Sequence, residues 1–140
     1  MGHGGDETTQ CLVPTKLTGG GIGETVVVQV AAGAAYSMAL TASGDLYTWG
    51  KRTFGVLGHG GGGEHLAVPR VVDGIGGAVT GMAGGGMHSL VTTAEGRVLV
   101  FGYGPRGMLG LGAGVISAPT PTAIDGITMG EGEEGKEGKE

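Results

Sequence analysis

The fold is decided by one stretch that occurs twice, as VVQVAAGAAYSMALTASGDLYTWGKRTFGVLGHGGGGEHLAVPRVVDGI at residues 27–75 and as VTGMAGGGMHSLVTTAEGRVLVFGYGPRGMLGLGAGVISAPTPTAIDGI at residues 79–127. The two copies align without a gap at an offset of 52 residues and are identical at 17 of 49 positions, about half of them not glycine. The aromatic pair Trp49 and Phe101 adds to these identities. Because a fixed period separates repeat architectures from low complexity, the chain is a repeat protein.

The composition alone would point the other way, since 35 of the 140 residues are glycine, against an average of about 7%. A charged content of 15% and a hydrophobic content of 39% nevertheless argue against a charge-driven disordered chain. No apolar run approaches the roughly 18 residues of a membrane span, so no membrane contact is expected. The single cysteine, Cys11, cannot form an internal disulfide, and an intracellular location, cytoplasmic or nuclear, is expected.

Each copy contains four short apolar runs bounded by glycine, and these runs are expected to form strands. They lie at residues 25–32, 36–41, 45–49 and 67–72, and at residues 78–83, 88–93, 97–101 and 122–127. Gly44 and Gly96 lie between the second and third runs, where glycine can close a tight hairpin. No amphipathic helix of ten residues can be drawn. The chain is therefore predicted to be all-β, with four-stranded antiparallel β-propeller blades.

A partial earlier copy precedes the two full ones, because residues 13–15 (VPT) resemble residues 68–70 (VPR). About 2.5 repeats of 52 residues are too few to close a propeller, so a fragment of a larger propeller, or association with further blades or other copies, is expected. The expected divisions are a partial repeat with a glycine-rich linker, two repeats, and a disordered tail of glycine, glutamate and lysine, at residues 1–24, 25–76, 77–128 and 129–140.

Residues 44–50 (GDLYTWG) and 54–60 (FGVLGHG) resemble the regulator of chromosome condensation repeat, and the second copy carries the same frame at residues 96–102 and 107–112. The resemblance covers about residues 2–127. It implies a seven-bladed propeller of four-stranded blades, of which this chain would be an incomplete part. Tyr36 stands where the family usually places histidine before serine, and Phe101 stands where it places tryptophan.

The resemblance implies a binding module for a protein partner and no enzyme. The alternative is a guanine-nucleotide exchange factor for a Ran-like small GTPase, as in the founding members. The residues expected to contact a partner from exposed turns and strand ends are Arg52, Arg70, Arg97 and Arg106. The positions expected to hold the repeat structure are Gly33, Ser37, Gly44, Trp49, Gly50, Gly55, Leu57, Gly58, Gly85, His88, Ser89, Gly96, Phe101, Gly102, Gly107, Leu109 and Gly110.

Other chemistry is not indicated. Residues 58–63 and 102–107 match Gly-x-Gly-x-x-Gly, but a quarter-glycine chain produces such matches by chance, and no helix follows to receive phosphates. The histidines His3, His59, His65 and His88 lack metal-ligand spacing, so neither a metal nor a cofactor is expected. Ser37 and Ser89 are repeated structural positions rather than nucleophiles. The 8 basic residues are too scattered for a nucleic-acid surface.

Overall fold

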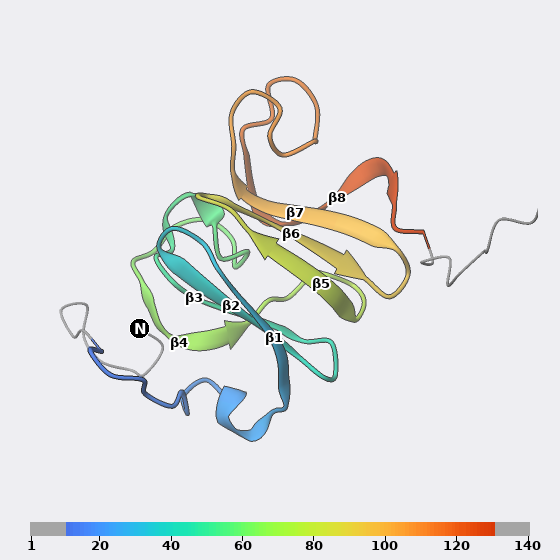
Figure 1. Cartoon of the computed structure of the whole chain (residues 1–140). Coiled ribbons are helices and arrows are strands. Elements are labelled where there is room, and N and C mark those ends of the chain that lie inside the picture. Colours follow the sequence, from blue (N-terminus) through green and yellow to red (C-terminus); the bar gives the residue numbers. More distant parts are fainter. Residues whose placement is uncertain (1–10, 131–140) are drawn as a thin grey trace, which may run out of the picture.

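A computed structural model describes residues 11–130 as two four-stranded antiparallel sheets, each with its strands in chain order (Figure 1). The first sheet, blade 1, contains β1 (Val27–Ala32), β2 (Tyr36–Thr41), β3 (Leu46–Gly50) and β4 (Leu66–Val71). The second sheet, blade 2, contains β5 (Val79–Gly84), β6 (His88–Thr93), β7 (Arg97–Tyr103) and β8 (Ser117–Thr128). The all-β prediction of four-stranded antiparallel blades is confirmed. The expectations for His3 and for most of the tail fall on residues 1–10 and 131–140, outside the described residues.

Seven strands begin within one residue or two of their predicted positions, whereas β8 begins at Ser117 rather than at residue 122. Two prolines, Pro119 and Pro121, lie in the part of β8 that precedes residue 122. β8 is an edge strand, so a missing N–H on its outer side breaks no ladder bond. β7 extends with it, because Tyr103 pairs with Ser117.

The two blades pack face to face around a shared apolar core. Tyr36, Met38 and Leu46 on blade 1 meet Val91 and Phe101 on blade 2, and each of these side chains is buried. Strands β1 and β5 lie side by side (Figure 1). Consecutive repeats therefore form consecutive blades, as in a propeller.

Glycine permits the backbone at the turns that the repeat predicts. Gly44 and Gly96 have φ angles of 89° and 80° in the β2–β3 and β6–β7 hairpins, a region that residues with a Cβ rarely adopt. Gly102 has a φ of 115°, and a Cβ there would collide with the Met87 carbonyl. Within residues 11–130 the helical segments are two three-residue 3-10 turns, η1 (Ile22–Glu24) and η2 (Thr53–Gly55). No helix in this part of the chain is long and apolar enough to span a membrane.

Candidate partner-binding surface

The strand order brings four connections to one end of the paired blades (Figure 1). These are the short turns 33–35 and 85–87 and the long loops 51–65 and 104–116. We call this end the loop end. The β2–β3 and β6–β7 hairpins and the linker 72–78 lie at the opposite end, which we call the hairpin end.

The long loop of blade 1 is anchored across the seam between the blades. Its Gly60 N–H donates a hydrogen bond of 2.9 Å to the Pro119 carbonyl on β8. The Phe54 ring of the same loop packs on Tyr103 of β7, with ring centroids 5.2 Å apart. The loop end of one blade is thus held by the other, and its side chains sit on a supported backbone.

Both long loops place a side chain outward through an uncommon backbone conformation. Phe54 and Arg106, which occupy the same repeat position, have φ angles of 61° and 63°. Such left-handed backbone in residues with a Cβ is uncommon and gathers at functional positions. Phe54 is 54% exposed, and Arg106 is exposed. The repeat therefore presents one exposed side chain per blade in its long loop.

A small apolar pocket of about 110 Å³ opens at the loop end where the two blades meet. We call it the seam pocket; its lining residues come from both blades and are Ala34, Ala35, Tyr36, Lys51, Thr53, Phe54, Val56, Gly86 and Met87. Small-molecule sites usually measure about 300–1,000 Å³, so this pocket is too small for a cofactor.

Tyr36 joins the blades beneath this pocket. Its hydroxyl lies 2.8 Å from Ser89 Oγ and donates to backbone carbonyls at His88 (2.8 Å) and Gly85 (3.3 Å). Ser89 is fully buried. Burial raises the pKa of the Tyr36 hydroxyl above its ordinary value of 10.0, so the group stays protonated and able to donate. The Tyr36–Ser89 pair is a structural contact and leaves Ser89 no role as a nucleophile.

His59 has a structural environment as well. Its Nε2 lies 2.8 Å from Thr48 Oγ1, and the Thr48 hydroxyl donates to the Leu57 carbonyl at 2.7 Å. Since that hydroxyl has one proton, the imidazole is the donor to it. Burial, then the nearby Arg70 charge, lowers the pKa of His59 from 6.5 to about 4. Across residues 11–130, no three or more His, Cys, Asp or Glu side chains gather into a possible metal site.

The four arginines predicted to contact a partner lie in different places. Arg106 is exposed in loop 104–116, and Arg70 is exposed on β4. The expectation of exposure was wrong for the other two. Arg52 is half-buried against the backbone of loop 51–65, and Arg97 is half-buried at the hairpin end, where its guanidinium donates to the carbonyls of Ile75 (2.9 Å) and Gly76 (2.8 Å). Arg97 thus secures the linker between the blades.

The predicted repeat positions fall into three groups. The side chains of Trp49, Leu57, Ser89, Phe101 and Leu109 are buried, whereas Ser37 and His88 are half-buried. Gly33 and Gly85 leave room for the Tyr36 ring and for the His88 side chain. The remaining glycines lie at strand ends, hairpins and loops: Gly44, Gly50, Gly55, Gly58, Gly96, Gly102, Gly107 and Gly110.

Sequence reasoning missed four side chains that shape the loop end. Phe54, Met87 and Met108 are 54%, 45% and 55% exposed, and Lys51, which lines the seam pocket with Phe54 and Met87, is exposed as well. Aromatic and methionine side chains are enriched in protein interfaces. The signal that could have found them is the presence of large apolar residues inside glycine-rich loops.

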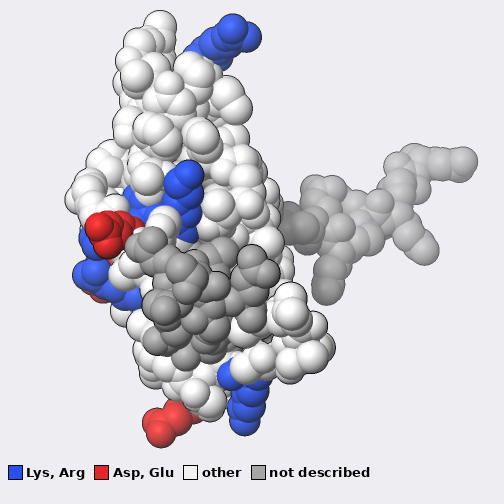
Figure 2. Space-filling model, turned by 90° about the vertical axis from the view of Figure 1, so that its left-hand side faces the viewer, with Lys and Arg blue, Asp and Glu red and all other residues white. Residues whose placement is uncertain are grey.

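Charge is divided between the two ends. Loop-end segments carry Lys51, Arg52 and Arg106 against one acid, Glu64. The hairpin end carries the acids Asp45, Asp73 and Glu95 together with Arg97, which is hydrogen-bonded to the linker. Figure 2, which views the molecule from the left side of Figure 1, shows basic side chains together with an acidic one in the middle of this side, a basic and an acidic side chain near the bottom, and a further basic side chain at the tip of the uppermost loop.

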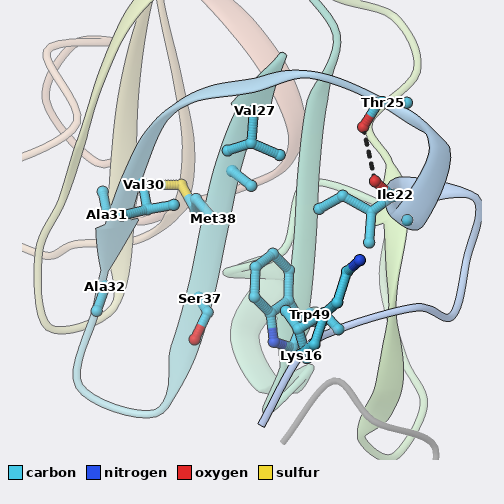
Figure 3. A pocket seen from close by; sticks show the side chains of 13 residues that line it. Lys16, Ile22, Thr25, Val27, Val30, Ala31, Ala32, Ser37, Met38 and Trp49 are labelled. Atoms are coloured by element: carbon cyan, nitrogen blue, oxygen red, sulfur yellow. Dashed lines mark hydrogen bonds between the residues drawn. The ribbon is translucent and has the colours of Figure 1, made fainter. Parts of the chain in front are cut away.

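The face of blade 1 that points away from blade 2 is only partly covered. A hollow of about 610 Å³ opens there, with Met38 and Ser37 of β2 and Trp49 of β3 in its wall (Figure 3). Ile22 packs on Trp49 at one side of it. We call this the open face.

Blade 2 shows what a covered face looks like at the same repeat positions. Val79 of blade 2 is 4% exposed against 39% for Val27 of blade 1. Ser89 is buried against Tyr36 of the preceding blade. Ser37, its repeat equivalent, lines the hollow. The open face is therefore an inter-blade surface on which part of the packing found between blades 1 and 2 is missing.

Stacked four-stranded blades with supported loops at one end define a β-propeller repeat protein. Two models of the regulator of chromosome condensation (RCC1) repeat match the chain, at residues 43–92 and 27–55. The chain belongs to the RCC1 repeat family.

Two curated relatives illustrate the similarity. The E3 ubiquitin-protein ligase HERC2 of Homo sapiens is 41% identical over 116 residues, covering 80% of this chain and 2% of that protein. The mitochondrial RCC1 domain-containing protein RUG3 of Arabidopsis thaliana is 36% identical over 129 residues, covering 90% and 27%. The chain thus spans a small part of the curated relatives it matches.

Solved structures show the same fold. Human WBSCR16 is 32% identical with a TM-score of 0.68, over 76% of this chain and 26% of that one. Yeast RCC1 (Prp20), solved bound to Kap60, is 24% identical with a TM-score of 0.67, over 72% of this chain and 25% of that one. At that identity the likeness to Prp20 concerns the fold alone.

Proposed function

We propose that this RCC1-type propeller segment is a non-enzymatic protein–protein interaction module that binds its partner at the loop end. The observation that carries the proposal is that Phe54 and Met87, from different blades, line the seam pocket with Lys51 and are about half exposed, while Met108 and Arg106 are exposed on the long loop of blade 2. Aromatic, methionine and arginine side chains are enriched in protein interfaces. In this proposal the repeats 25–76 and 77–128 act as one unit.

Binding without catalysis fits the side chains that could otherwise react. The hydroxyl of Ser89 is buried against Tyr36, and the imidazole of His59 is committed to Thr48. A protein partner also fits the structural relative Prp20, which was solved bound to Kap60 and has binding properties to Gsp1p and histones. We propose an intracellular location, because Cys11 is a free, exposed thiol suited to a reducing compartment.

Site-specific photo-crosslinking tests where the partner binds. p-Benzoylphenylalanine replaces Met108 at the loop end or Met129 at the hairpin end; both methionines are 55% exposed. We expect a protein adduct from position 108, and that protein, once identified and purified, should bind the wild-type chain reversibly. Adducts from position 129 alone, or equally from both positions, would contradict a loop-end interface.

The second candidate is guanine-nucleotide exchange on a Ran-like small GTPase. The observation in its favour is the fold shared with Prp20, a protein that binds Gsp1p. Release of a fluorescent nucleotide from a purified Ran-like GTPase tests it. Acceleration well above background would place exchange ahead of simple binding, whereas an unchanged rate would leave the interaction module as the function.

We further propose that additional blades cover the open face, either in a longer polypeptide or through self-association. The incomplete packing around Val27 and Trp49 supports this, because exposed apolar faces and free strand edges favour association. Light scattering on the purified chain is expected to show association. A monodisperse monomer that unfolds cooperatively would contradict the proposal.

A further inference from the structure

The seam pocket has the size of one side chain. An engineered cavity of about 150 Å³ takes a benzene molecule, so the 110 Å³ of the seam pocket suits a branched aliphatic side chain. Its walls are contributed by both blades, from Ala34 and Ala35 to Gly86 and Met87, with the Tyr36 ring among them. The Tyr36 hydroxyl is hydrogen-bonded to Ser89 and to backbone carbonyls. A ligand in the pocket would therefore contact the ring of this tyrosine and not its hydroxyl.

The rim of the seam pocket is apolar and adaptable. Phe54 and Met87 line the pocket and are about half exposed. Methionine side chains fit irregular partners because they are flexible and polarizable. A partner side chain that enters the pocket would also be covered by these two residues, which is how a central anchor is shielded from water.

The charge around the pocket selects an acidic partner. Lys51 lines the pocket and is exposed. Its backbone N–H donates a hydrogen bond of 2.9 Å to the Ala35 carbonyl, which holds the Lys51 backbone in place beside the pocket. Arg106 is a second exposed cation of the loop end, on the long loop of the neighbouring blade. The hairpin end carries the acids Asp45, Asp73 and Glu95, so an acidic segment is attracted to one end and repelled from the other.

We propose that the loop end binds a short acidic segment of a partner protein, which inserts one aliphatic side chain into the seam pocket and places carboxylates toward Lys51. This inference rests on the proposed function and names the partner's chemistry. The chain's own residues 131–140 (EGEEGKEGKE) supply carboxylates but no apolar side chain. They lack the anchor that the pocket accepts, so the occupant is a segment of another protein.

The test is a titration of the full chain, labelled at its methionine methyl groups and observed by NMR, with three synthetic peptides. The probes are the capped pentapeptides EELEE, EEAEE and KKLKK. We expect EELEE to shift the Met87 resonance and leave Met129 unmoved. We expect EEAEE to bind about tenfold more weakly, because it loses a buried side chain, and KKLKK not to bind.

Matched variants separate the pocket from general charge. Lys51→Glu should weaken EELEE binding about tenfold, whereas Arg70→Glu makes the same charge change on β4, away from the pocket, and should leave the affinity within twofold. Ala34→Leu fills the pocket from an exposed position and should abolish the preference for EELEE over EEAEE. A thermal melt of each variant, unchanged from wild type, shows that folding is intact.

The outcomes also distinguish this inference from the proposed function. Equal binding of EELEE and EEAEE, or shifts at Met129 in place of Met87, would overturn the acidic-segment inference, even if the crosslink from position 108 still captured a protein. A chain ending at residue 130 that binds EELEE at least tenfold more tightly than the full chain would show that the acidic tail occupies the loop end, and would also overturn it. If EELEE does not bind and position 108 gives no crosslink, both the acidic-segment inference and the proposed loop-end interface are refuted.

Discussion

Replacing Tyr36 with phenylalanine removes the hydroxyl that joins the two blades and keeps the ring. That hydroxyl makes 2.8 Å contacts with Ser89 Oγ and the His88 carbonyl, and Ser89 is fully buried. A buried hydrogen bond contributes about 0.5–1.5 kcal/mol, and a buried group left unsatisfied costs about 1–3 kcal/mol. We therefore expect Tyr36→Phe to lower the free energy of unfolding by about 2 kcal/mol.

The double-mutant cycle isolates the bond itself. Ser89→Ala alone should cost about 1 kcal/mol, and the double variant should cost at least 0.5 kcal/mol less than the sum of the two, because no hydroxyl is then left unpaired. Urea unfolding followed by circular dichroism measures all four proteins. Ser37→Ala is the matched control, since Ser37 occupies the same repeat position on the open face and should change stability by less than about 0.5 kcal/mol. Additive effects of the two substitutions would refute the inter-blade bond.

Three further predictions concern other positions. The pKa of His59 is lowered from 6.5 to about 4 in the folded chain. Between these two pH values His59 is therefore protonated in the unfolded chain and neutral in the folded chain. As the pH falls through this window, the free energy of unfolding should drop by about 1–2 kcal/mol, reduced for partial exposure; urea titrations should show this drop shrinking in His59→Gln, and an identical drop in both proteins would contradict it. Gly102→Ala should cost more than about 2 kcal/mol, since its Cβ meets the Met87 carbonyl, whereas Gly86→Ala, with open space around it, should cost less than about 0.5 kcal/mol in the same unfolding assay. Ile22→Ala should cost about 2 kcal/mol and shift the emission of Trp49, the chain's single tryptophan, to longer wavelength; unchanged emission would argue against this packing.

The sequence was sufficient to predict the blades because each repeat supplies a reference for the other. Gly44 and Gly96 match at the offset of 52 residues, and both close hairpins with positive φ. Trp49 and Phe101 match as aromatic residues, and both are buried. The residue type at such a position is determined by its role within the blade or by contact with the next blade along the chain. The same residue types therefore recur in each repeat of the sequence.

The binding surface was harder to predict because it depends on contacts between blades and on residues that differ between the repeats. Phe54 and Arg106 share a backbone conformation but not a side chain, so the alignment gives no sign that both point outward. The hydrogen bonds of Arg97 go to linker carbonyls, which have no sequence signature. The seam pocket exists only once blade 2 is packed against blade 1.

The face-to-face stacking of consecutive repeats brings their loops to one end of the molecule. Nuclear Overhauser effects in solution test it most directly. The stacked blades predict cross-peaks between Tyr36 and Ser89, whose oxygens lie 2.8 Å apart, and between the rings of Phe54 and Tyr103, whose centroids lie 5.2 Å apart. Cross-peaks confined to residues within one repeat, with neither the Tyr36–Ser89 nor the Phe54–Tyr103 cross-peak observed, would contradict the face-to-face stacking of the blades.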